Sequence, residues 1–180
     1  MSRLAAVLLL ALAAIGCGAD GKGFTPFGAP DFTATDLNPD SSTYDETRTL
    51  SAERGQVMLL LFMGFACEYC RIQFAELRTL YHGWRAEGIG ADGLELWVIG
   101  PPIAGHQVGE FADGSDVPCF IDGGTGDESV YSMYGAEIDH LFLIDRQGTA
   151  RHRLDLFVAP LGLEASRERL DALVRQLLSG

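Results

Sequence analysis

The feature of this sequence that most restricts its fold is an uninterrupted apolar segment, residues 57–63, which lies shortly before a pair of cysteines. Seven residues are the length of a strand rather than of a core helix. The segment has no alternating polar positions, which is typical of a strand covered on both faces. Such a strand needs neighbouring strands and covering helices. We therefore expect a sheet buried within an α/β domain.

A helix is predicted to begin at the cysteine pair. The apolar positions there recur at spacings of four, three, four and three residues, which places them on one face of a helix: Cys70, Phe74, Leu77, Tyr81 and Trp84. Gly88 is the expected stop. The buried strand is thus followed almost at once by an amphipathic helix, with the cysteines at the junction.

Further elements complete the domain. We expect strands at 94–99 and 117–121, a hairpin of 141–145 with 149–157, helices at 128–134 and 164–178, and a strand or hairpin arm at 31–37. Residues 105–114 are ambiguous between a loop and a short helix. Strands separated by helices and closed by an antiparallel hairpin predict a mixed sheet with helices on both faces.

The N-terminal residues have the pattern of an export signal. Arg3 precedes twelve apolar residues, 4–15, too few to span a bilayer, and Gly16 and Cys17 follow. The small residues before Cys17 resemble the bacterial lipobox. We predict a signal peptide at 1–16, lipidation of Cys17, a flexible tether at 17–30 and a globular domain at 31–180. An ordinary signal peptide with a coincidental cysteine is the alternative.

Composition narrows the class of protein. Of the 180 residues, 47% are apolar and 21% are charged, which excludes a highly charged disordered chain. The 25 acidic residues outnumber the 13 basic ones, and the formal net charge is −12. Such a charge argues against nucleic acids and anionic membrane surfaces as partners held by charge.

The C-x-x-C motif of Cys67 and Cys70 carries the predicted chemistry. A helix N-terminus presents unpaired N–H groups and a partial positive charge, which favour a thiolate at Cys67, the species that attacks disulfides. Cys70, one turn further along, would be more buried and able to resolve a mixed disulfide. A static disulfide and half of a zinc site are the alternatives. No second Cys/His pair at zinc-ligand spacing is visible, so redox or metal-handling function is favoured.

Three segments carry a family resemblance: residues 30–33 with the following apolar strand, the cysteine motif with its helix up to Tyr81, and YG at 134–135 with FLIDRQG at 142–148. Together they resemble the thioredoxin-fold lipoproteins and periplasmic proteins of the TlpA/ResA and redoxin group. The resemblance implies a thioredoxin-like fold with an N-terminal β-hairpin extension. It also implies a thiol-disulfide oxidoreductase on the periplasmic side of a membrane, anchored by lipid. Its partners would be disulfides of exported proteins and an upstream thiol reductant, without a cofactor. Cys67 matches the attacking cysteine and Cys70 the resolving one.

The sequence departs from this family at three positions near the motif. Ala66 replaces a tryptophan, and Gln73 replaces a glutamate that many members carry near the buried thiol. Gln73 cannot accept a proton, so a base for Cys70 must come from elsewhere. Asp139 stands where the family has a cis-proline facing the cysteines, and a carboxylate there would raise a thiol pKa. Glu68 and Tyr69, between the cysteines, are further candidate site neighbours.

Asp139 and His140 also resemble, in part, the Asp-His element of the Sco copper chaperones. Two thiolates and an imidazole suit copper, so a copper chaperone using Cys67, Cys70 and His140 is the alternative function. We favour a surface or hydrogen-bonded loop role for His140 over ligation. Cys119 is expected to be a core residue. A peroxidase-like redoxin is a third class, but its Pro/Thr-bearing loop around the reactive cysteine is absent.

Overall fold

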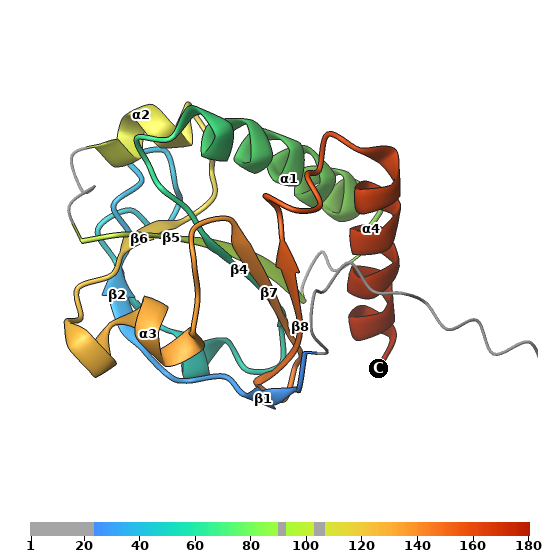
Figure 1. Ribbon diagram of the computed structural model, residues 1–180, viewed down its shortest axis with the longest axis horizontal. Coiled ribbons are helices and arrows are strands. Elements are labelled where there is room, and N and C mark those ends of the chain that lie inside the picture. Colours follow the sequence, from blue (N-terminus) through green and yellow to red (C-terminus); the bar gives the residue numbers. More distant parts are fainter. Residues whose placement is uncertain (1–23, 90–92, 103–106) are drawn as a thin grey trace, which may run out of the picture.

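The structure is a computed structural model that describes residues 24–89, 93–102 and 107–180 (Figure 1). The elements in chain order are β1 (Phe27–Gly28), β2 (Thr33–Thr35), β3 (Thr47–Thr49), the 3-10 helix η1 (Leu50–Glu53), β4 (Val57–Phe62), α1 (Glu68–Ala86), β5 (Leu94–Gly100), α2 (Val108–Ala112), β6 (Cys119–Ile121), the 3-10 helix η3 (Gly126–Glu128), α3 (Val130–Tyr134), β7 (His140–Ile144), β8 (Thr149–Asp155) and α4 (Glu164–Ser179). The described part of the chain therefore has the mixed α/β composition expected from its pattern.

The apolar segment becomes the inner strand β4. The sheet order is β1-β8-β7-β4-β5-β6, with β4 parallel to β5 and antiparallel to β7. All six residues of β4 are buried, and their side chains alternate between two cores: Val57, Leu59 and Leu61 in one, Met58, Leu60 and Phe62 in the other. The continuous apolar run is thus explained by helices and loops on both faces of the sheet.

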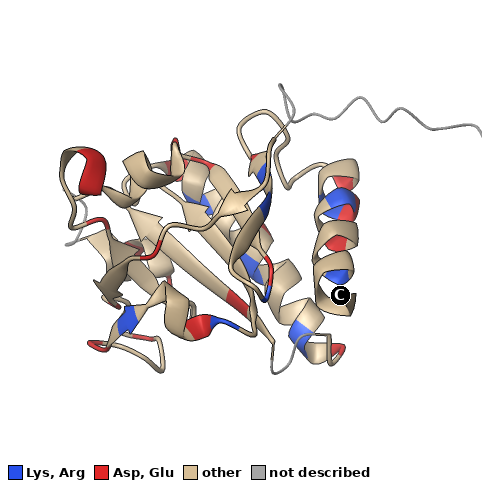
Figure 2. Cartoon of the chain, turned by 90° about the horizontal axis from the view of Figure 1, so that it is seen from below, with Lys and Arg blue, Asp and Glu red and all other residues tan. Residues whose placement is uncertain are grey.

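The two cores are covered by different elements (Figure 1). Residues of α1, α2 and α4 pack into one core, and residues of α3, η1 and the β2–β3 hairpin pack into the other. The apolar face predicted for α1 is buried at every position. The indole N–H of Trp84 donates to Asp171 at 2.8 Å and so joins α1 to α4. Acidic and basic residues alternate along α4 (Figure 2).

The predicted tether is wrong over residues 24–30. β1 pairs antiparallel with β8, Ala29 N–H donates to Gly148 O at 2.9 Å, and Phe24 and Phe27 pack against Phe142. The folded domain therefore begins before the expected boundary at residue 31. A two-residue strand is too short to show an alternating pattern, so no periodicity in the sequence indicates it. The predicted signal peptide and Cys17 lie outside the described residues.

Short elements form in the segments that the sequence pattern left ambiguous or predicted only approximately. Residues 108–112 of the ambiguous segment form the short helix α2. The helix expected at 128–134 is split into η3 and α3, and Gly135 ends α3 with φ 54°, in the left-handed region that glycine adopts freely. The N-terminal hairpin is present as β2 paired with β3. Within the described part of the chain, no helix has the length and apolar character needed to cross a bilayer.

Candidate active site

Cys67 lies at the N-terminus of α1, after the short loop that follows β4. Its Sγ accepts the backbone N–H of Cys70 at 3.2 Å, so the sulfur caps the helix in the position where a Ser or Asp oxygen is commonly found. Cys67 is half-buried, so part of the residue is exposed to solvent. A sulfur at this position receives an N–H bond and lies at the partly positive end of the helix.

Cys70 is a free thiol buried one turn behind Cys67. Burial raises the pKa of Cys70 well above its ordinary value, and its hydrogen bond to Cys67 and the nearby charge of Asp139 act in the same direction. The two sulfurs therefore have different surroundings, one reachable at a helix end and one neutral and shielded. This asymmetry follows from the helix geometry that the sequence predicts.

Asp139 faces Cys70 from the residue before β7. Its N–H donates to Phe62 O at the end of β4 (2.8 Å), and its carbonyl accepts from Leu156 N–H (2.9 Å). The backbone is in the left-handed region, with φ 72°, which is unusual for a residue other than glycine. The side chain is buried, and its Oδ1 has no hydrogen-bond partner among the described residues. Burial raises the pKa of Asp139, although its hydrogen bond with Cys70 opposes the rise.

No protein-family model matches the sequence, and no curated protein matches it. Solved structures do match. A thioredoxin-family thiol:disulfide interchange protein from Chlorobium tepidum is 16% identical with a TM-score of 0.62, over 87% of this chain and 99% of that one. This chain has a thioredoxin-like fold. A candidate protein disulfide isomerase from Bacteroides thetaiotaomicron is 27% identical with a TM-score of 0.62, over 84% of this chain and 88% of that one.

The neighbours of this thioredoxin-like chain also include BsSco, a member of the Sco family of cytochrome c oxidase assembly proteins. It is 16% identical with a TM-score of 0.62, over 85% of this chain and 94% of that one. The resemblance to thioredoxin-fold proteins is thereby confirmed, and the names of the first two neighbours agree with the prediction of a thiol-disulfide oxidoreductase.

Gln73 and His140 are both engaged in hydrogen bonds to the backbone. The amide oxygen of Gln73 accepts from Leu161 N–H at 2.8 Å and so ties α1 to the loop before α4. Nδ1 of the buried His140 accepts from Glu137 N–H at 3.0 Å, and burial followed by the charge of Arg153 lowers the pKa of His140. Across the described residues, no group of three or more His, Cys, Asp or Glu side chains is placed to hold a metal ion.

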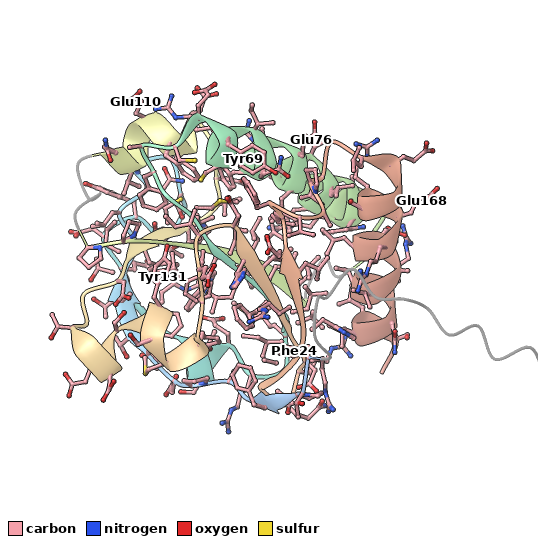
Figure 3. All side chains as sticks on the ribbon, in the orientation of Figure 1. Phe24, Tyr69, Glu76, Glu110, Tyr131 and Glu168 are labelled. Atoms are coloured by element: carbon pink, nitrogen blue, oxygen red, sulfur yellow. The ribbon has the colours of Figure 1, made fainter. Side chains whose placement is uncertain are left out.

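Tyr69 connects the motif to the loop after β8. Its hydroxyl donates to Leu156 O at 2.7 Å, and its ring lies 5.8 Å from that of Phe157. Figure 3 labels Tyr69 on α1. Glu68 is exposed in the first turn of α1. Cys119 is fully buried and its thiol donates to Val117 O, in keeping with a core position.

Two features of the site were missed from the sequence. The hydroxyl of Tyr131 donates to Met63 O (3.2 Å) and Ile99 O (3.1 Å), and so supports the loop between β4 and Cys67 from the opposite face of the sheet. Phe157 lies beside the motif instead of ending a strand, because β8 stops at Asp155. An apolar Phe-Val pair directly after a strand was the available signal.

Proposed function

We propose that this chain is an extracytoplasmic thiol-disulfide oxidoreductase in which Cys67 attacks and Cys70 resolves. One observation carries the proposal. The Cys67 sulfur caps α1 and belongs to a partly exposed residue, while Cys70 is buried within the same first turn. A reachable nucleophile backed by a shielded second thiol is what a two-step exchange requires.

In the first step, the Cys67 thiolate attacks one sulfur of a partner disulfide. A mixed disulfide forms, and the partner's other sulfur leaves as a thiolate that takes a proton from water. In the second step, Cys70 loses its proton and its sulfur attacks Sγ of Cys67. The intramolecular disulfide forms, the second partner sulfur leaves, and two electrons have passed to the partner.

In this proposal, the carboxylate of Asp139 accepts the proton that Cys70 loses. It is the carboxylate beside the buried thiol, and its Oδ1 has no hydrogen-bond partner among the described residues. A carboxylate whose pKa is raised is a stronger base than an exposed one, and so is better suited to a thiol whose pKa is also raised. Asp139 thereby takes the role that Gln73 cannot perform.

The partners and the location follow from the sequence features. An export signal with a lipidated Cys17 would hold the domain at the membrane, where disulfides of other exported proteins are available. An external thiol reductant would return two electrons and two protons to the Cys67–Cys70 disulfide. The exchange uses only protein sulfur, so the proposal includes no metal or cofactor.

The test compares the wild-type domain with Cys67→Ser and Cys70→Ser in the reduction of a disulfide peptide. We expect turnover only with both cysteines, and we expect Cys70→Ser to accumulate a mixed disulfide through Cys67. In native membranes, the same variant should capture exported proteins. Equal turnover by Cys67→Ser would overturn the proposal, as would the lack of any mixed disulfide while Cys67 still reacts with a thiol reagent.

A further inference from the structure

Three large apolar side chains that are exposed come from loops that border the cysteine motif. Six such side chains are exposed in the described part of the chain: Tyr44, Ile72, Ile138, Phe157, Val158 and Leu163. Phe157 is 72% exposed, Val158 63% and Ile138 46%. These three come from the two loops that flank β7 and β8, and both loops border the cysteine motif. A Phe and a Val exposed to this extent gain nothing in an isolated domain, whereas an apolar cluster beside a reactive group is typical of an interaction site.

Distances place Ile138 and Phe157 beside the cysteine motif. The point that a Cβ would occupy at Gly64 lies 3.4 Å from Ile138 Cδ1, 3.4 Å from Cys67 Cβ and 3.8 Å from Cys70 Sγ. Ile138 therefore adjoins the motif. On the other side, the Phe157 ring lies 5.8 Å from the ring of Tyr69, which is between the two cysteines in sequence.

Hydrogen bonds hold these side chains in place. Tyr69 donates to Leu156 O, and Leu156 N–H donates to Asp139 O, which links the three segments around the motif. Oδ1 of Asp155 accepts the N–H groups of Phe157 (3.0 Å) and Val158 (3.2 Å). The exposed apolar groups are thus presented by a bonded framework, so a partner would lose little entropy in ordering them.

The charges around this surface are mainly acidic. Glu68 and Glu137 are exposed, and Asp155 is partly exposed. Arg71, the basic residue that follows the motif, is paired with Glu110 at 2.7 Å. With a formal net charge of −12 for the whole chain, a basic segment would be attracted to this face and an acidic one repelled.

We propose that Tyr69, Ile138, Phe157 and Val158 form a docking surface for a disulfide-bearing segment whose cysteine has apolar and basic neighbours. This inference rests on the proposed function and names the substrate class for the same site. The apolar neighbours would cover Phe157 and Val158, and the basic ones would face Glu68, Glu137 and Asp155. The partner disulfide would then lie against Cys67.

The experiment uses three disulfide peptides of equal length, in which the residues beside the cysteines are Leu and Lys, Leu and Glu, or Ser and Gly. A small uncharged disulfide, bis(2-hydroxyethyl) disulfide, measures the intrinsic exchange. We expect kcat/KM for the Leu/Lys peptide to exceed that for the Leu/Glu peptide about tenfold at low salt, with the difference shrinking as salt screens the charges. The Ser/Gly peptide should lie below the Leu/Lys peptide.

Variants then assign the preference to the surface. In Phe157→Ser/Val158→Ser, the ratio of kcat/KM for the Leu/Lys peptide to that for the small disulfide should fall about tenfold. Tyr44→Ser is the matched control, because Tyr44 is 54% exposed and belongs to another loop, and it should keep the wild-type ratio. Glu137→Lys should reduce the Lys-over-Glu preference.

Three outcomes would overturn the inference. Equal rates for all three peptides, with the small disulfide still reduced, would remove the docking surface and leave the proposed function standing. An unchanged ratio in Phe157→Ser/Val158→Ser would do the same. Failure of the wild-type protein to reduce any of the four disulfides would remove both proposals together.

Discussion

Two buried aspartates of this chain differ in what surrounds them. Asp122 follows β6, and its carboxylate is fully occupied: Ser129 Oγ–H donates at 2.6 Å, Gly124 N–H at 3.0 Å and Tyr131 N–H at 3.1 Å. Burial acts to raise the pKa of Asp122, but these hydrogen bonds outweigh it and the pKa is lowered. Asp122 thereby organises the turn into η3 and α3.

Asp139, in contrast to Asp122, lacks a hydrogen-bond donor from the described residues at one of its carboxylate oxygens. Its Oδ1 has no hydrogen-bond partner in the described part of the chain, its backbone has a positive φ, and burial raises its pKa. A buried carboxylate in this condition costs stability, and such residues collect at functional sites. Burial alone therefore does not set the direction of the pKa shift of an aspartate. The supply of hydrogen-bond donors separates the structural carboxylate of Asp122 from that of Asp139, which we propose as a base.

Asp122→Ala gives the largest expected effect, a loss of about 3 kcal/mol in the free energy of unfolding. The substitution leaves the N–H groups of Gly124 and Tyr131 without their acceptor. Urea unfolding measures the loss, and Asp127→Ala, which removes an exposed acid from the same segment, should change stability by less than about 0.5 kcal/mol. If the two variants are equally stable, Asp122 is not the structural carboxylate described above.

Asp139→Asn is expected to slow the resolving step about 100-fold, the usual effect of removing a general base. The amide has nearly the same size but cannot accept the proton of Cys70. Rapid acid quenching of a preformed mixed disulfide measures its decay. The remaining rate should rise steeply with pH as solvent base takes over, and Asp139→Glu should restore part of the rate. A wild-type rate in Asp139→Asn would assign the proton to another acceptor.

The same substitution should stabilise the protein in a pH-dependent way. Below the ordinary Asp pKa of about 4, the Asp139 carboxyl is protonated in both the folded and unfolded states. Wild type and Asp139→Asn then both have a neutral side chain at this position, so their stabilities should be similar. As pH rises, the unfolded chain ionises first, and the wild type loses stability until the pH passes the raised folded pKa of Asp139. Asp139→Asn should therefore melt about 3 °C higher at pH 7.5, with the gain shrinking toward pH 4. A constant difference across this range would contradict the raised pKa.

Local patterns predicted most of the fold. The uninterrupted apolar run fixed β4, and the spacing from Cys70 to Trp84 fixed α1, because each pattern reports burial directly. β1 was missed because it has only two residues and depends on pairing with β8. The position of Cys67 and Cys70 at the start of a helix could be predicted because it is local. The surroundings of the candidate site could not be predicted where distant segments meet: the apolar surface at Phe157 depends on where β8 ends, and the bond from Leu161 to Gln73 joins two elements far apart in sequence.

The smallest effect is expected at His140. This residue is next to Asp139 in sequence, but like Asp122 it accepts a hydrogen bond, which Glu137 N–H donates to its Nδ1. Replacing His140 with Ala removes the bond from Glu137 N–H to Nδ1, which we expect to cost about 1 kcal/mol of stability. Exchange by Cys67 and Cys70 should stay within about twofold of wild type, since neither proposed step moves a proton through the imidazole. Disulfide reduction measures the exchange, and competition against a Cu(I) chelator measures whether the imidazole contributes to metal binding. A tenfold or larger fall in Cu(I) affinity in His140→Ala would show that His140 can leave its backbone bond to act as a ligand, and would make the copper chaperone the better assignment.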